Sequence, residues 1–231
     1  KDQQTQKLNL TDELESFSSF SDSNGYYVLN NTLMYQDKAL LSKHGWSLKG
    51  AHNLLNAAAV CEVIRLLGLS MMSCINHIKS FKALPHRLQE LPQITELKAI
   101  NDSISSTPQS TLAAIATVEH NDTFLLVGGF DRGLDWQCFV DSLKQQGQIL
   151  KYVLCSGQNG QSIEQLLTRE LPAQKTQYFE DLKSAVMFAC QQAEKNDTLL
   201  LSPGAPSFDA FANYQQRGVQ FEAWIKQYFM S

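Results

Sequence analysis

The sequence predicts an α/β fold in which helices cover both faces of a mostly parallel, doubly wound sheet. Three observations support this prediction. After Pro85, short apolar runs alternate regularly with helical patterns. The runs FLLVGG, YVLCSG and TLLLSPG are continuously apolar, which is typical of strands buried on both faces. Each run is followed by small residues, at the edge where ligands gather in folds of this class.

The beginning of the chain has a different pattern. Residues 1–25 are polar and rich in serine, so we expect a loop with one short helix. Two apolar runs within 26–41 flank the pair Asn30-Asn31, which predicts a β-hairpin. The chain begins with a polar stretch and not with Met, which suggests a piece of a longer protein.

Two helices are expected before the alternation starts. Apolar residues recur at helical spacing over about 52–67, and Gly68 is placed to end that helix. A second helix over about 70–81 ends before Leu84-Pro85. We therefore expect a first domain over residues 1–84.

Residues 85–231 contain the alternating pattern and are expected to form one second domain. Strands are predicted at 96–101, 124–129, 150–155, 176–179 and 197–202. Helices are predicted at 108–118, 135–146, 162–170, 182–195 and 207–228. Candidate site residues should then lie in the loops after the strands.

Composition limits the classes of function. The 231 residues carry a net charge of −4 and no block of Lys and Arg, which argues against a nucleic-acid-binding surface. No run approaches the roughly 18–20 apolar residues of a membrane span. The five cysteines include no CxxC pair and the five histidines lack ligand spacing, so reduced thiols and no metal site are expected.

The segment INDSISST follows the first strand of the second domain. Thr107-Pro108 predicts a helix start, with a hydroxyl cap and proline at the first helical position. Asp102 has two interpretations. Its carboxylate closes a turn on its own backbone, or it accepts hydrogen bonds from ribose hydroxyls or backbone N–H groups of a ligand site.

The segment GGFDRGLD follows the second strand. Gly128 and Gly129 permit a close approach to the backbone, and Arg132 offers a planar fork for a carboxylate or phosphate. A solvated surface arginine is the alternative. The chain has neither GxGxxG nor GxxxxGK[ST], so no phosphate loop of the usual kind is present.

The segment SPGAPSFDAFANYQQRG follows the last strand. Ser207 is expected to cap the long terminal helix, whose N–H groups suit an anion. Tyr214, seven residues later, would share its helical face. For Phe208, Phe211 and the later aromatic residues the alternative is core packing. Arg87, in LPHR at the domain junction, is placed to reach a ligand held between domains.

Taken in order, HNLLNAAA, LPHR, INDS, GGFDRGLD and SPGAPSFDAFANYQQRG resemble the Mur ligases, from about residue 26 to the end. The resemblance implies that residues 1–84 are the last part of a central ATP-binding domain. It also implies that residues 85–231 are a Rossmann-like C-terminal domain that binds glutamate. No segment like the family's phosphate loop is present, so no catalytic residue is assigned and the chain alone is expected to be inactive.

The resemblance assigns two sets of site residues. For ATP it implies Asn53 and Asn56 near the adenine, Arg87 at ribose and phosphate, and Asp102 at the ribose. For glutamate it implies the set Arg132, Ser106, Ser207, Phe208 and Tyr214. One position departs from the family pattern, because Ile104 stands where a lysine is usual.

The implied activity is ATP-dependent addition of glutamate to UDP-N-acetylmuramoyl-L-alanine in peptidoglycan precursor synthesis, and hence a role in cell-wall biogenesis, cell shape and cell division. D-glutamate is favoured, and L-glutamate is kept open because a loop of the NDSIS type occurs in a branch that adds it. ATP and Mg²⁺ are implied, with the Mg²⁺ ligands mainly outside this chain, in a cytoplasmic monomer. The alternatives are a ligase similar to folylpolyglutamate synthase and a non-catalytic binding or partner module.

Overall fold

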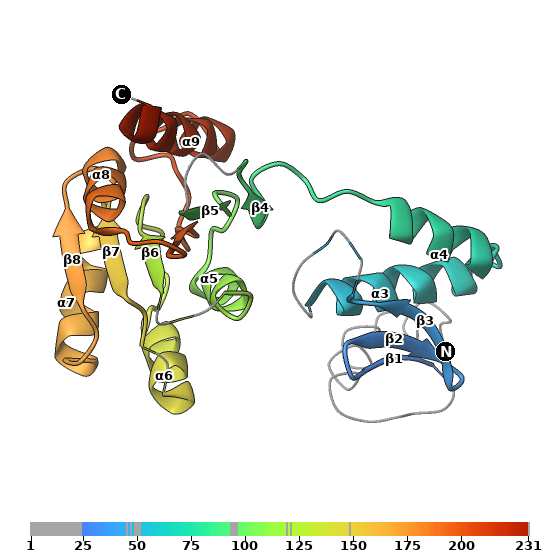
Figure 1. Ribbon diagram of the computed structural model, residues 1–231. Coiled ribbons are helices and arrows are strands. Elements are labelled where there is room, and N and C mark those ends of the chain that lie inside the picture. The colour runs from blue at the N-terminus through green and yellow to red at the C-terminus, as the bar shows by residue number, and fades with distance from the viewer. Residues whose placement is uncertain are drawn as a thin grey trace. The chain divides into compact units, whose positions relative to one another are not determined.

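The computed structural model describes residues 25–44, 46, 48, 52–92, 97–118, 120, 122–147 and 149–230. The chain forms two compact units, and the division falls between Ala83 and Leu84 (Figure 1). The loop and short helix expected over the first residues lie outside the described part.

The first unit contains a three-stranded antiparallel sheet in the order β1-β2-β3, formed by Tyr26–Leu29, Thr32–Tyr35 and Lys38–Ser42. Both connections are two-residue turns, Asn30-Asn31 and Gln36-Asp37, and all four of these residues have positive φ. Such turns match the twist of the strands they join. The predicted hairpin is present as β1 and β2. The prediction lacked the third strand, β3, which follows the turn at Gln36-Asp37.

Two helices complete this unit, α3 over His52–Leu66 and α4 over Met71–Ser80. The helices and the sheet bury apolar side chains against each other. Among these are Tyr26 and Leu33 of the sheet and Leu54 and Cys61 of α3. Both helices were expected within a residue of these bounds. Gly68 follows α3 with φ of 68°, the left-handed conformation that ends many helices.

The second unit is built on a six-stranded sheet in the order β4-β5-β9-β6-β7-β8. The strands span Gln89–Glu90, Lys98–Asn101, Thr123–Val127, Tyr152–Ser156, Thr176–Phe179 and Thr198–Leu201 for β4 to β9. Only β4 runs antiparallel to its neighbour. The prediction of a mostly parallel α/β sheet is confirmed. The two-residue strand β4 was not predicted.

Five helices cover this sheet. They are α5 Pro108–Ile115, α6 Gln137–Gln146, α7 Gly160–Glu170, α8 Leu182–Gln192 and α9 Tyr214–Met230. One apolar core joins α5, α6 and α7 to one face of the sheet, and a second joins α8 and α9 to the other (Figure 1). The sheet is therefore doubly wound. No helix in the described ranges is both long and apolar enough to span a membrane.

The last helix begins later than the sequence pattern predicts. Its first residue is Tyr214, and the side chain of Asn213 accepts a 2.8 Å hydrogen bond from the backbone N–H of Gln216. Ser207 instead lies in a separate turn, where its carbonyl accepts from the N–H groups of Ala210 and Phe211. The expectation that Ser207 caps α9 is therefore wrong, and Ser207 and Tyr214 do not share a helical face.

Candidate ligand-binding site

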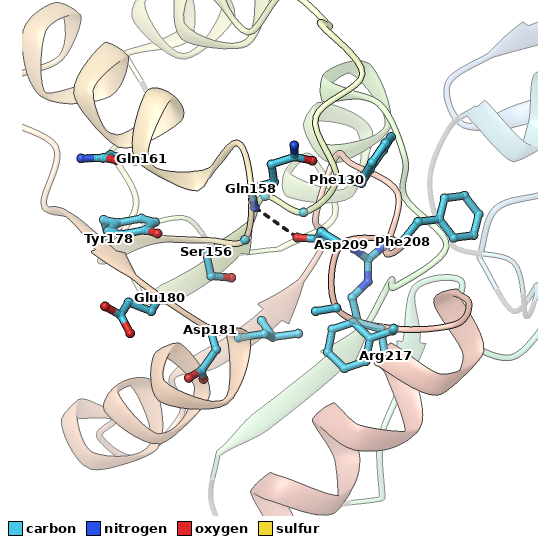
Figure 2. A pocket seen from close by; sticks show the side chains of 16 residues that line it. Phe130, Ser156, Gln158, Gln161, Tyr178, Glu180, Asp181, Phe208, Asp209 and Arg217 are labelled. Atoms are coloured by element: carbon cyan, nitrogen blue, oxygen red, sulfur yellow. Dashed lines mark hydrogen bonds between the residues drawn. The ribbon is translucent and has the colours of Figure 1, made fainter.

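A cavity of about 540 Å³ lies at the carboxyl ends of β6, β7 and β8 in the second unit (Figure 2). Its walls are the loop after β6, the loop after β7, the β8–α8 connection and the segment before α9, with Gln161 and Arg217. The ends of parallel strands are where ligands bind in open α/β sheets. The location is therefore the one that the fold class predicts.

Backbone hydrogen bonds tie the loop after β6 to the loops on either side. The N–H of Gly129 donates to Oδ1 of Asn159 at 2.9 Å, and its carbonyl accepts from the N–H of Asn159 at 3.1 Å. The N–H of Phe130 donates to the carbonyl of Pro206 at 2.9 Å. These bonds fix the cavity walls relative to one another.

The glycine pair in this loop is required by the neighbouring backbone. A Cβ atom at Gly128 would lie 2.1 Å from the carbonyl oxygen of Ser156, and one at Gly129 would lie 2.4 Å from that of Pro206. Gly129 also packs beside Arg217, whose Nη1 would be 3.1 Å from such a Cβ. Other loops therefore approach these glycines closely, and both glycines also line the cavity, where a ligand was expected to approach.

Arg217 on α9 is the buried charge of the cavity, with 2% of its surface exposed. Its Nε donates to Oγ of Ser103 at 3.0 Å, and its Nη2 donates to the carbonyls of Ser103 at 2.8 Å and Ala205 at 3.0 Å. The remaining nitrogen, Nη1, is buried and has no hydrogen-bond partner in the described structure. Burial lowers the pKa of Arg217 to about 10, although the charge of Asp209 opposes this shift.

Carboxylates provide the other charges around the cavity. Oδ2 of Asp209 accepts a 3.1 Å hydrogen bond from the N–H of Gln158, which joins the segment before α9 to the loop after β7 (Figure 2). Asp181 caps α8 by accepting from the N–H of Ser184 at 2.7 Å. Glu180 is exposed at the same side. The cavity thus combines one buried cation with three carboxylates at its rim.

Asp102 lies outside this cavity and does not close a turn with its side chain. Oδ1 accepts from the N–H of Leu88 at 3.1 Å, and Oδ2 accepts from the hydroxyl of Ser202 at 2.8 Å. Burial raises the pKa of Asp102 to about 6, while these two bonds and the charge of Arg87 lower it. The side chain therefore links β5 to the loop after β9 and to the segment before β4.

The residues expected at ATP lie in two pairs, one in each unit. On α3, Nδ2 of Asn56 donates to Oδ1 of the buried Asn53 at 3.3 Å. In the second unit, the exposed Arg87 acts electrostatically on Asp102. The structure therefore brings Asn53 and Asn56 into direct contact.

Of the residues expected at glutamate, only Phe208 lines the cavity. It is 68% exposed, and its ring meets the edge of Phe130 at a centroid distance of 6.5 Å. Arg132 is exposed on the loop two residues beyond Phe130. Ser106 lies just before the cap of α5, and Ser207 is buried in its turn.

The opening loop and the final helix meet at Ser103, next to Arg217 of the cavity wall. The hydroxyl of Ser103 donates to the carbonyl of Tyr214 at 2.8 Å and accepts from Arg217. Asp209 and Arg217 were not singled out from the sequence. A signal for Arg217 was present, because it precedes Phe221 and Ile225 at intervals of four residues on the buried face of α9.

Within the described ranges, no group of three or more His, Cys, Asp or Glu side chains is placed to hold a metal ion. The sequence resemblance implies Mg²⁺ ligands mainly outside this chain, so this finding does not bear on that expectation.

Comparison with known proteins gives a family match over the second unit. Residues 86–204 match the model for the Mur ligase, glutamate ligase domain. A UDP-N-acetylmuramoyl-L-alanine–L-glutamate ligase of Xanthomonas axonopodis is 35% identical over 208 residues, which cover 87% of this chain and 43% of the relative. A UDP-N-acetylmuramoylalanine–D-glutamate ligase of Hydrogenobaculum is 32% identical and covers 92% and 50%. The chain spans about half the length of these curated relatives or less.

Solved structures share the fold at low sequence identity. The bifunctional folylpolyglutamate synthase/dihydrofolate synthase of Yersinia pestis has a TM-score of 0.60 at 15% identity, over 86% of this chain and 44% of that one. The MurF ligase of Thermotoga maritima, solved in complex with ADP, has a TM-score of 0.54 at 16% identity, over 89% and 45%. At these identities the likeness concerns the fold alone.

Proposed function

This chain belongs to the Mur ligase family, and from that premise we propose that it is the glutamate-binding part of an ATP-dependent ligase. The observation that carries the proposal is the cavity at the carboxyl ends of β6–β8, because the loops after these strands lie within residues 86–204, which match the glutamate ligase domain. The whole protein would join glutamate to UDP-N-acetylmuramoyl-L-alanine through an amide bond, as the names of the relatives describe. Its pathway would then be peptidoglycan precursor synthesis in the cytoplasm.

The residues proposed for ATP are Asn53, Asn56, Arg87 and Asp102. The hydrogen bond between Asn56 and Asn53 holds these two amides together, and the charge of Arg87 lowers the pKa of Asp102. Asp102 uses one lone pair of each oxygen for Leu88 and Ser202. The lone pairs that remain can accept from ribose hydroxyls.

The residues proposed for glutamate are Arg132, Ser106, Ser207, Phe208 and Tyr214. Phe208 supports this set directly, since it lines the cavity beside Phe130. Arg132 extends from the same loop as Phe130 and is exposed, so its fork is available to a carboxylate at the cavity mouth. Ile104 stands where a lysine is usual in the family, and it carries no charge that could pair with a carboxylate of glutamate.

We propose L-glutamate as the enantiomer, in preference to D-glutamate. The relatives from Xanthomonas axonopodis and Xylella fastidiosa, at 35% and 36% identity, are both named for L-glutamate. The relative named for D-glutamate is 32% identical. The loop NDSIS, with Ile104 in place of lysine, agrees with this choice.

The proposed reaction proceeds through an acyl phosphate. The carboxylate of UDP-N-acetylmuramoyl-L-alanine is activated by phosphoryl transfer from ATP, the amine of glutamate attacks the acyl carbon, and phosphate leaves as the amide forms. This chain would hold glutamate by its carboxylates and present its amine. Such positioning accounts for much of the rate in reactions of this kind.

The test is ADP release by the longer gene product that contains this chain. We expect release only when UDP-N-acetylmuramoyl-L-alanine and L-glutamate are both present, with D-glutamate much less effective. Release that instead requires a folate acceptor would favour the folylpolyglutamate-synthase alternative. No release with either acceptor, from a protein shown to bind ATP, would favour a non-catalytic module.

A further inference from the structure

Two free thiols lie where α3 and α4 pack against each other in the first unit (Figure 1). Cys61 is on α3, five residues before the helix ends at Leu66, and Cys74 is on α4, three residues after the helix begins at Met71. Residues 67–70 form a short connection, so positions at similar distances from it meet across the helix pair. Both thiols belong to one apolar cluster, in which Cys61 is fully buried and Cys74 is partly buried.

Hydrogen bonds fix the beginning of α4 in this cluster. The N–H of Cys74 donates to the carbonyl of Ser70 at 3.1 Å, and the hydroxyl of Tyr26 in β1 donates to Sδ of Met71 at 3.1 Å. Burial raises the pKa of that hydroxyl, and the neighbouring Cys61 adds to the shift. Tyr26 therefore has Cys61 on one side and the first turn of α4, which carries Cys74, on the other.

The two thiols also act on each other. Burial raises the pKa of Cys61 to about 12, and Cys74 adds to the shift through its charge and a hydrogen bond. Cys190 in the second unit is a contrast, because burial alone raises its pKa to about 12. Cys61 is therefore a shielded, protonated thiol at neutral pH with a second thiol beside it. Cys74 is the member of the pair that solvent reaches.

We propose that Cys61 and Cys74 are an oxidation site, which hydrogen peroxide converts into a reversible disulfide between α3 and α4. The thiolate of Cys74 attacks one oxygen of the peroxide, the O–O bond breaks, and hydroxide leaves and takes up a proton. Cys74 is then a sulfenic acid. Sγ of Cys61 attacks Sγ of Cys74, the S–O bond breaks, and the leaving hydroxide takes the proton of Cys61.

The reaction balances without any other reactant. Two thiols and one hydrogen peroxide give one disulfide and two waters, so the two sulfurs are oxidised and the two peroxide oxygens are reduced. Cys61 thus diverts Cys74 from further oxidation to the sulfinic acid, which thiol reductants do not reverse. The reaction does not depend on the activity proposed above.

Peptide mapping of the folded chain tests the site directly. Arg65 lies between the two cysteines, so cleavage by trypsin after Lys49, Arg65 and Lys79 gives peptides 50–65 and 66–79 with one cysteine each. The reduced chain would be exposed to hydrogen peroxide, quenched, alkylated in denaturant and digested. We expect the two peptides to be joined and lighter by two hydrogens, and dithiothreitol to separate them again.

Three variants assign the role of each thiol. In Cys61→Ala, dimedone should trap the sulfenic acid of Cys74 about 10-fold more than in the wild type, because the adjacent thiol that consumes it is gone. In Cys74→Ser, Cys61 should stay unmodified because it is buried. Cys138→Ala removes the other partly exposed thiol and is the control, which should form the same joined peptides. If Cys61→Ala fails to fold, the wild type and Cys74→Ser still decide.

Met72 provides an internal measure of exposure to peroxide, since it is 72% exposed and lies in the same peptide as Cys74. The dose would be raised until Met72 becomes the sulfoxide. Sulfoxide at Met72 without joined peptides would overturn the inference, and so would joined peptides that form only in denaturant. Equal trapping of Cys74 by dimedone in the wild type and in Cys61→Ala would also overturn it.

Discussion

Oδ2 of Asp102 accepts a 2.8 Å hydrogen bond from the hydroxyl of Ser202, a residue 100 positions later in the sequence. The bond joins the ends of β5 and β9, which are neighbours in the sheet. Asp102 is 5% exposed and Ser202 is fully buried, so the carboxylate has lost most of its contact with water. This pair places Asp102, the residue proposed for ribose, beside the loop after β9, and that loop continues to the cavity.

The buried carboxyl of Asp102 should make stability depend on pH. Its pKa is about 6 in the folded protein, against 3.8 as the ordinary value, so the folded state binds the proton more tightly than the unfolded chain. The stabilisation is full below about pH 4 and is lost as pH rises through about 6. Relative to Asp102→Asn, the wild type should lose about 2–3 kcal/mol of unfolding free energy over that interval, measured by urea unfolding.

Ser202→Ala serves as the matched comparison for that measurement. It removes a bond that lowers the pKa of Asp102, so the loss of stability should extend to higher pH. An identical pH profile for wild type and Asp102→Asn would show that the carboxyl is not perturbed in the folded protein.

The start of α5 should be sensitive to its cap. Oγ1 of Thr107 accepts from the N–H of Ser110 at 3.2 Å, and Oγ of Ser110 accepts from the N–H of Thr107 at 3.2 Å, which forms a capping box. Thr107→Ala should lower the free energy of unfolding by about 1 kcal/mol, as seen by denaturant titration. Ser106→Ala, one residue earlier, should change it by less than about 0.5 kcal/mol. Equal effects of the two substitutions would argue against the cap.

Two glycines with the same backbone conformation should respond differently to alanine. Gly204 has φ of 63° and Gly133 has φ of 67°. A Cβ at Gly204 would lie 2.6 Å from the ring of Trp136 and 2.7 Å from Oγ1 of Thr111, whereas one at Gly133 would meet nothing within 4 Å. Gly133→Ala should cost about 1 kcal/mol of stability and Gly204→Ala about 2–4 kcal/mol, by thermal unfolding. Similar costs would mean that the packing around Gly204 is looser than described.

Arg132 should contribute to glutamate affinity in the longer protein. The side chain is exposed, so we expect Arg132→Ala to raise the Michaelis constant for glutamate by about 10-fold and to change that for the UDP-linked substrate little. Ile104→Ala should leave both within a few-fold, since Ile104 offers no charge. An unchanged Michaelis constant for glutamate in Arg132→Ala would remove Arg132 from the site.

The sequence was informative where a local pattern decides the structure. Continuous apolar runs predicted the parallel strands, and Thr107-Pro108 predicted the start of α5, because burial and capping depend on neighbouring residues. The start of α9 was misplaced because Ser207 resembles a cap. The observed cap, Asn213 with Gln216, is an equally local signal, and the turn that Ser207 forms with Ala210 and Phe211 separates Ser207 from the helix.

The site was less predictable than the fold. The cavity is formed by loops that meet only because β6, β7 and β9 are neighbours, and this order is not visible in any one segment. Arg217 was missed because arginine is seldom fully buried, and its burial depends on contacts with Ser103 and Ala205 far away in the sequence. Arg132 is a candidate from the sequence because its fork follows a glycine pair at the end of a strand. It does not line the cavity.

The most direct test of the central claim is a crystal structure of this chain with L-glutamate bound. We predict density for the amino acid at the carboxyl ends of the strands of the second unit, in contact with Phe208 and with one carboxylate on the guanidinium of Arg132. Glutamate bound away from Phe208 and Arg132 would contradict the account.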